Sequence, residues 1–246
     1  MDINKVEALF NEVHKFFIDT DNLKPIKIEV KKDEIKNKED IINLFRIEKS
    51  ENPIYKDITC LEDAYEAIDS IIKYTNEYKE SIASTLRGFD DINDENTNIA
   101  LSGIFSAISN FEKVLNKQIR KGIDEELDED EIKEKLASNL IKLLDQRLIR
   151  NVVKPLYEGI KYNDCEVYRV VIEKTNIYIK SYGIYTINLE VNGDFDYDFI
   201  EPQEASNNIT DDYRLEEKIK EIHQYPYIFD EDNIVSQGKI VVWRKG

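Results

Sequence analysis

The strongest pattern for chemistry in this chain is three aspartates at alternate positions, Asp194, Asp196 and Asp198. Clustered carboxylate oxygens are the ligands that Ca²⁺ and Mg²⁺ prefer. An EF-hand loop starting at Asp194 would need glycine and glutamate where Phe199 and Ala205 stand. In a strand, the aspartates would share one face in water while the aromatic residues between them face the core. We expect no metal site here, and a metal-dependent enzyme using these aspartates is the least favoured alternative.

The other reactive residue types form no recognisable catalytic arrangement. His14 lies on the rim of an apolar helical pattern, and His223 has no serine, cysteine or second histidine placed as a nucleophile or base. Neither Gly-x-Gly-x-x-Gly nor a phosphate loop occurs, and the eight glycines offer little material for one. Cys60 and Cys165, far apart in sequence, are read as reduced thiols. We expect a protein that is not an enzyme and needs no cofactor.

Composition narrows the choice of partners. Acidic residues outnumber basic ones by 51 to 34, which gives a net charge of −17. A field of that sign repels phosphate backbones and anionic lipids, so neither nucleic acid nor a membrane is an expected partner. Residues 1–7 lack the basic flank and apolar core of a signal peptide, and no apolar run reaches membrane-spanning length. We expect a cytoplasmic protein.

Apolar periodicity predicts mainly helices in the first three quarters of the chain. Helical spacing is found over 2–18, 37–47, 61–86 and 99–122, and one strand is expected over 26–30. The helices over 61–86 and 99–122 could pair as an antiparallel hairpin or extend into an oligomer interface. Seven carboxylates in Asp124–Glu131 suit a solvated linker that leads into the first turn of the next helix.

The next helices lead into a change of period. Apolar residues recur every four positions from Ile132 to Ile160, and Pro155 should kink or restart this helix near Val152–Lys154. A further helix stops at Gly183, after which a two-residue period predicts short strands. The expected fold is α+β, with domains over 1–58 (an α/β extension), 59–183 (helical) and 184–246 (a small β-domain).

The order of elements over residues 136–245 resembles the C-terminal half of the GrpE family, the nucleotide exchange factors of DnaK-type chaperones. Residues 152–160, Val-Val-Lys-Pro-Leu-Tyr-Glu-Gly-Ile, are similar to the family's Leu-Leu-Pro-x-Leu-Asp-x-Leu pattern. Residues 179–187, Ile-Lys-Ser-Tyr-Gly-Ile-Tyr-Thr-Ile, fit its Leu-x-x-x-Gly-Val/Ile signature. Gly193-Asp194-Phe195-Asp196 and Glu204-Ala205 follow its Gly-x-x-Phe-Asp-Pro and His-Glu-Ala elements. In the final element, Pro226 replaces a glycine and Ser236-Gln237 replace Arg-Pro.

The resemblance implies a dimeric cochaperone whose β-wing binds the nucleotide-binding domain of a DnaK-type chaperone and releases ADP. It implies partner contacts by Tyr227, Tyr225, Asp196, Glu204 and Ser236, and structural roles for Pro155, Gly183, Gly193 and Gly238. Tyr227 is expected to be exposed beside a turn, whereas Phe195 and Tyr197 are expected in the core. We also expect a homodimer, formed through the apolar stripes between Leu61 and Leu148. The alternative is a helical scaffold or adaptor whose β-wing binds another partner.

Overall fold

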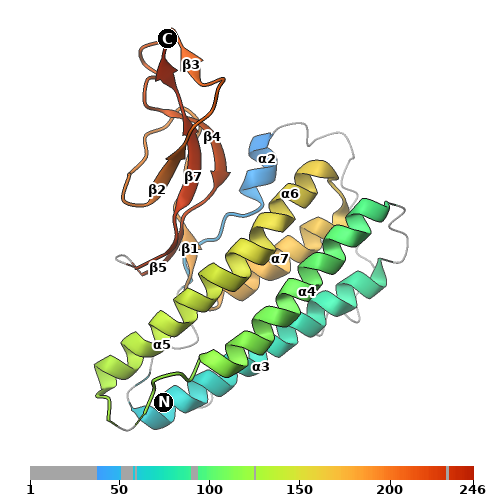
Figure 1. Cartoon of the computed structure of the whole chain (residues 1–246), viewed down its shortest axis with the longest axis vertical. Coiled ribbons are helices and arrows are strands. Elements are labelled where there is room, and N and C mark those ends of the chain that lie inside the picture. The colour runs from blue at the N-terminus through green and yellow to red at the C-terminus, as the bar shows by residue number, and fades with distance from the viewer. Residues whose placement is uncertain (1–37, 51–57, 59, 90–93, 125, 231–232) are drawn as a thin grey trace. The chain divides into compact units, whose positions relative to one another are not determined.

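The fold is α+β, with long helices followed by a small β-region, residues 184–246 (Figure 1). The computed structural model describes residues 38–50, 58, 60–89, 94–124, 126–230 and 233–246. The helix expected over 2–18 and the strand expected over 26–30 lie outside these residues. In the described part of the chain, no helix is long and apolar enough to cross a membrane.

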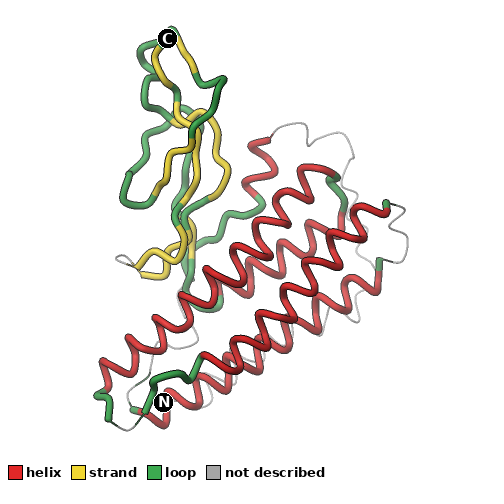
Figure 2. The backbone as a smooth tube through the Cα atoms, in the orientation of Figure 1, coloured by secondary structure: helices red, strands yellow, loops and turns green. Residues whose placement is uncertain are grey.

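The helices fall close to the positions that periodicity indicates (Figure 2). They are α2 (Lys38–Asn43), α3 (Leu61–Gly88), α4 (Glu95–Gln118), α5 (Glu129–Leu143), the π-helix η1 (Leu144–Val153), α6 (Lys154–Tyr162) and α7 (Glu166–Lys180).

Short strands build three small sheets in the β-region. The strands are β1 (Tyr185–Thr186), β2 (Ile200–Gln203), β3 (Ile209–Thr210), β4 (Ile219–Gln224), β5 (Tyr227–Asp230), β6 (Asn233–Ser236), β7 (Gly238–Val242) and β8 (Arg244–Lys245). The sheet orders are β1-β5-β6, β2-β7-β4 and β3-β8. β2 runs parallel to β7, and β3 runs parallel to β8, whereas the other pairs are antiparallel.

Polar side chains cap the N-termini of α4 and α5. Asp94 caps α4 by accepting hydrogen bonds from the backbone N and the hydroxyl of Thr97, which hold the pKa of this carboxyl below its ordinary value. Asp128 and Glu131 form a reciprocal capping box at α5. The acidic run therefore does supply the first turn of α5, where the helix dipole favours negative charge.

Pro155 is accommodated by a change in helical hydrogen bonding. An α-helical pattern would bring the proline ring against the carbonyl four residues earlier. The chain instead forms the ten-residue π-helix η1 before the proline, and the N–H of Lys154 reaches back to the carbonyl of Ile149. The side-chain amide of Asn151 donates to the carbonyl of Gln146 in the same helix, at 2.9 Å. The restart expected near Val152–Lys154 thus takes the form of a wider turn.

Two adjacent helices, α3 and α7, run antiparallel and share the most polar part of the core. The hydroxyls of Thr75 and Tyr178 lie 2.7 Å apart, and those of Tyr78 and Thr175 lie 2.8 Å apart. The rings of Tyr78 and Tyr178 stack at 4.3 Å. Burial raises the pKa of both tyrosines, which keeps them neutral as hydrogen-bonding groups.

The same four-residue pattern appears on both helices. Thr-Asn-x-Tyr occupies 75–78 in α3 and 175–178 in α7, so each threonine meets the tyrosine of the other helix. Next to this pair, Lys174 is only 6% exposed and donates to the hydroxyls of Ser81 and Thr85 at 2.7 and 2.8 Å. The Thr75–Tyr178 and Tyr78–Thr175 pairs therefore join α3 and α7 reciprocally, and we call these two pairs the lock. Periodicity alone did not indicate it, because all of these residue types also occur on solvated faces.

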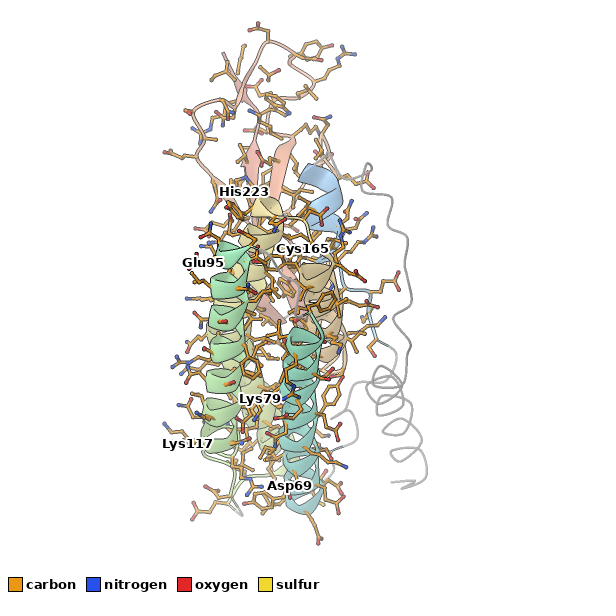
Figure 3. All side chains as sticks on the ribbon, turned by 90° about the vertical axis from the view of Figure 1, so that its right-hand side faces the viewer. Asp69, Lys79, Glu95, Lys117, Cys165 and His223 are labelled. Atoms are coloured by element: carbon orange, nitrogen blue, oxygen red, sulfur yellow. The ribbon has the colours of Figure 1, made fainter. Side chains whose placement is uncertain are left out.

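The hairpin alternative for α3 and α4 is the one observed. Asp69 and Lys117 lie at one end of the helices and Glu95 at the other, so the two helices are antiparallel (Figure 3). The α3 stripe is covered within the chain: Ile68, Ile71, Tyr78 and Ile82 are each 0% exposed. The α3 part of the apolar stripes through which we expected a homodimer to form is therefore already buried within one chain. A homodimer consequently remains a prediction without that support.

The Tyr78–Thr175 hydroxyl pair should contribute measurably to stability. Tyr78→Phe removes one donor from a fully buried pair, so we expect a loss of about 1 kcal/mol in the free energy of unfolding. Thr175→Val should remove the same contact. In a double-mutant cycle by urea unfolding, the two changes should be non-additive, with a coupling of about 1 kcal/mol. Additive costs would contradict the contact.

Gly183 should tolerate no side chain. It follows α7 with φ 76°, in the left-handed region. Gly183→Ala should cost about 1–2 kcal/mol, and Gly183→Val should cost more because the branched side chain is stiffer there. The control is Gly103→Ala in α4, where an added Cβ meets nothing within 4 Å. That change should raise stability by up to about 1 kcal/mol. Equal effects at both positions in thermal unfolding would refute the difference.

Candidate interaction surface of the β-region

A short segment, residues 41–49, joins the β-region to the helices. The backbone N of Thr186 donates to the carbonyl of Ile47 at 2.9 Å, and the N of Ile47 donates to the Thr186 hydroxyl at 2.9 Å. Tyr225 donates to Oδ1 of Asn43 at 2.8 Å. This segment thus pairs with β1 and holds the residue that follows β4.

Aromatic packing strengthens the same junction. Phe45 packs edge-on against Tyr157 of α6, with ring centroids 5.7 Å apart. Burial raises the pKa of Tyr157 to about 12, and the carboxylate of Glu221 on β4 adds to this effect. On α7, Asn176 donates to the carbonyl of Leu44 at 2.7 Å. These contacts join residues 44–45 to α6 and α7.

Inside the β-region, two glycines stand at close approaches. A Cβ on Gly238 would lie 2.6 Å from a methyl of Ile200 and 2.8 Å from Cδ of Pro226. Gly238 therefore lets β7 lie beside β2 and the β4–β5 connection. At Gly193, a Cβ would lie 2.9 Å from the carbonyl oxygen of Glu190, across a tight turn. A side chain at either position would press on backbone or a proline ring.

The aspartate segment is a set of turns, so the strand expected there is wrong. Asp196 accepts a hydrogen bond from the backbone N of Asp198 at 2.9 Å, and Asp194 forms an ion pair with Lys218. Such local carboxylate–backbone bonds favour turns over strands. Among the described residues, no group of three histidine, cysteine or carboxylate side chains could hold a metal ion. Tyr197 is 64% exposed, so its expected place in the core is also wrong.

The two tyrosines assigned to a partner surface are buried. Tyr225 and Tyr227 are each 1% exposed, so the expectation that Tyr227 lies exposed beside a turn is wrong. β5 is the central strand of its sheet, and Tyr227 lies between Thr186 of β1 and Ser236 of β6. Burial raises the pKa of its hydroxyl.

The remaining residues assigned to a partner do not gather at one place. Asp196 and Glu204 are exposed, but on separate loops. Ser236 is half-buried and accepts a hydrogen bond from the side-chain amide of Gln224 at 3.1 Å. Its only neighbour within the assigned set is its cross-strand partner, Tyr227. The structure therefore does not assemble these five residues into one surface.

Two exposed apolar residues, Ile209 and Tyr213, lie in residues 207–218, which together with residues 243–246 are here called the distal end. This end contains β3 and the C-terminus (Figure 1). Tyr213 is 79% exposed and Ile209 is 56% exposed. Trp243, the only tryptophan of the chain, is half-buried there. Arg214 lies 6.0 Å from the centroid of the Tyr213 ring, and Lys220 lies 4.6 Å from the Trp243 centroid.

Backbone and side-chain bonds hold the distal end in shape. The N of Arg244 donates to the carbonyl of Asn208 at 2.7 Å, which continues the β3–β8 pairing. The indole N–H of Trp243 donates to Oδ1 of Asn192 at 3.2 Å. Asp212 accepts from the backbone N and the guanidinium of Arg214, which lower the pKa of that carboxyl.

This end has the composition of a protein-binding surface. Tyrosine, tryptophan and arginine are enriched among the residues that dominate interface energies. Sequence periodicity missed the set because residues 205–218 follow neither the helical nor the strand period. The available signal was Tyr213 itself, an aromatic residue inside an otherwise polar stretch.

The close approach at Gly238 should be needed for the β-region but not for the helices. Gly238→Ala should destabilise the β-region by about 1–3 kcal/mol, since Pro226 cannot move aside easily. Emission from Trp243 should report a lower unfolding midpoint than in the unmutated protein. The control Gly88→Ala, where nothing lies within 4 Å of an added Cβ, should leave this midpoint unchanged. An unaltered midpoint in Gly238→Ala would contradict the expected clash.

Comparisons with protein-family models, with curated proteins and with solved structures find no match for this chain. No family is therefore assigned to it. The function has to be argued from the residues of the chain and from the geometry above.

Proposed function

We propose that this protein is a GrpE-like cochaperone whose β-region binds the nucleotide-binding domain of a DnaK-type chaperone and promotes ADP release. The observation that carries the proposal is the distal end. It exposes Tyr213 and Ile209 and places Arg214 near the Tyr213 ring, on a β-region whose interior is packed. The resemblance over residues 136–245 supplies the identity of the partner.

The distal end suits binding for an energetic reason. Burying a side chain such as that of tyrosine in an interface removes apolar area from water, and an adjacent arginine can pair with partner carboxylates. Both groups lie in the turn segment between β3 and β4, whose backbone is held by the bond from Leu215 N to the carbonyl of Asp212 and by the bonds of Asp212 to Arg214. Residues 43–47 also bond the β-region, through Ile47 to Thr186 and Asn43 to Tyr225.

The mechanism is differential affinity for two states of the chaperone. A rigid projection that fits the open nucleotide cleft better than the closed cleft shifts that equilibrium toward the open state. The shift cannot exceed the difference between the two binding free energies. ADP then dissociates from the open cleft, and no catalytic side chain takes part.

A second candidate is an adaptor that uses the same distal end for a different partner. The observation that favours it is the burial of Tyr225 and Tyr227, two of the residues that the resemblance assigns to chaperone contact. Because they are buried, a partner would have to be bound by distal-end side chains, to which the resemblance assigns no role. The two candidates share the surface and differ in what it binds.

Nucleotide release separates the candidates. We expect the full chain to accelerate dissociation of a fluorescent ADP analogue from a DnaK-type chaperone of the same host. Tyr213→Ala with Arg214→Ala should weaken this effect at least about tenfold, since interface hot spots cost about 2 kcal/mol or more on truncation. The matched control is Ile99→Ala with Lys113→Ala, a similarly exposed pair on α4.

The outcomes are distinct. Equal loss in both double variants would remove the distal end as the binding surface. No acceleration by the unmutated protein, with any DnaK-type chaperone of the host, would replace the exchange-factor proposal by the adaptor. Both double variants should unfold at the same temperature as the unmutated protein. A loss of acceleration then reflects weaker binding to the chaperone and not a loss of folded protein.

A further inference from the structure

Asn192 and Gly193 form the only asparagine–glycine pair in the chain, and such a pair can react without an enzyme. The backbone nitrogen of the glycine can attack Cγ of the asparagine, because glycine has no side chain to shield that nitrogen. The nitrogen gives its proton to water or hydroxide, and its bond to Cγ forms as the Cγ–Nδ2 bond breaks. Nδ2 takes up a proton and leaves as ammonia. Water then opens the cyclic imide at either carbonyl, which yields aspartate or isoaspartate.

In the folded chain, hydrogen bonds occupy both reacting groups. The N–H of Gly193 donates to the carbonyl of Glu190 at 2.9 Å, so the attacking nitrogen is tied into a turn with its proton in place. Oδ1 of Asn192 accepts from the indole N–H of Trp243 at 3.2 Å, which restrains the side chain under attack. Asn192 has φ 64°, a left-handed conformation that asparagine adopts more readily than most residues. The exposed position of Asn192 nevertheless leaves it accessible to water.

The peptide bond between Asn192 and Gly193 is also held from both sides by one residue of β4. The N of Asn192 donates to the carbonyl of Ile219 at 2.7 Å, and the N of Ile219 donates to the carbonyl of Gly193 at 3.1 Å. Ring closure would remove the N–H of Gly193, and with it the turn bond to Glu190. Isoaspartate would add a carbon to the main chain between the two bonds to Ile219, so both could not be kept. The reaction therefore requires this turn to open.

We propose that Asn192 is a deamidation site, converted to aspartate or isoaspartate when the turn at residues 190–193 opens. The turn and the bond to Trp243 keep it intact while the turn is closed. Water is the only co-reactant, and no other protein takes part. Because ammonia leaves, closing the turn again does not restore the asparagine. The fraction of converted chains thus records how often the turn has opened.

Conversion changes both the charge and the contacts beside the distal end. A carboxylate replaces an amide, which adds negative charge next to Asp194 in an already acidic segment. In isoaspartate the carboxylate sits directly on Cα, so it cannot occupy the place of Oδ1, and Trp243 loses its acceptor. The proposal does not rest on the exchange activity, because it concerns the chemistry of the turn whatever the distal end binds.

Ageing of the full chain tests the site and its protection. At mildly alkaline pH, peptide mapping should find conversion at Asn192 in urea, and conversion at least about tenfold slower in the native chain, where only the opened fraction reacts. Hydrogen exchange at the amide of Gly193 should be slowed by a similar factor, because it needs the same opening. No conversion at Asn192 in urea would overturn the site. Equal rates in urea and in the native chain would overturn the protection.

Trp243→Phe tests the restraint on the side chain. It keeps an aromatic ring but removes the indole N–H, so native conversion should become faster. Exchange at the amide of Ile240, in the central strand β7, should stay unchanged. A rate no faster than in the unmutated chain would overturn the role of Trp243. A rise in exchange at Ile240 by the same factor would also overturn it, because protection would then belong to the β-region as a whole.

Asn192→Gly is the matched unreactive control. Glycine suits the left-handed φ and has no side chain to attack. Emission from Trp243, the only tryptophan, should shift to longer wavelength as the unmutated chain ages and the indole loses its acceptor. The emission of Asn192→Gly should be the same before and after ageing. An equal shift in both chains, or no shift in the converted chain, would overturn the link between Asn192 and the distal end.

Discussion

The paired hydroxyls between α3 and α7 are the constraint on which the rest of the structure depends. Four polar groups, from Thr75, Tyr78, Thr175 and Tyr178, are buried where an unmade hydrogen bond would cost about 1–3 kcal/mol. They can all be satisfied only at one axial offset of the two helices. Apolar packing alone would tolerate a slide of one turn far more easily. The lock fixes where α7 ends and therefore where the β-region begins.

A chain of contacts leads from the lock along α7 to residues 41–49. Asn176, next to the lock, holds the carbonyl of Leu44, and Gly183 turns the chain out of α7 into β1. Ile47 then pairs with Thr186. The attachment of the β-region through residues 41–49 thus traces back to hydrogen bonds in the helical core.

Sequence periodicity predicted the helices well because few structures besides an amphipathic helix place apolar residues at 3.6-residue spacing over twenty or so positions. The β-region was harder because its strands are two to six residues long. Alternation at 194–199 is typical of a strand, yet a carboxylate can bond the backbone two residues on and make a turn instead. The burial of Tyr227 depends on which strand is central in its sheet, which is a non-local property. For the same reason, the distal end had no periodic signal to reveal it.

The pairing of Ile47 with Thr186 also bears on the order in which the protein can fold during synthesis. The two residues are 139 positions apart, and Asn43 and Tyr225 are 182 apart. Residues 41–49 leave the ribosome long before Thr186 and Tyr225 are made. Until then, Ile42, Phe45 and Ile47 lack the contacts that bury them in the finished protein. The helical hairpin of α3 and α4 can form meanwhile, because its contacts are closer in sequence. During translation, this apolar segment is thus accessible to chaperones until the β-region has been made.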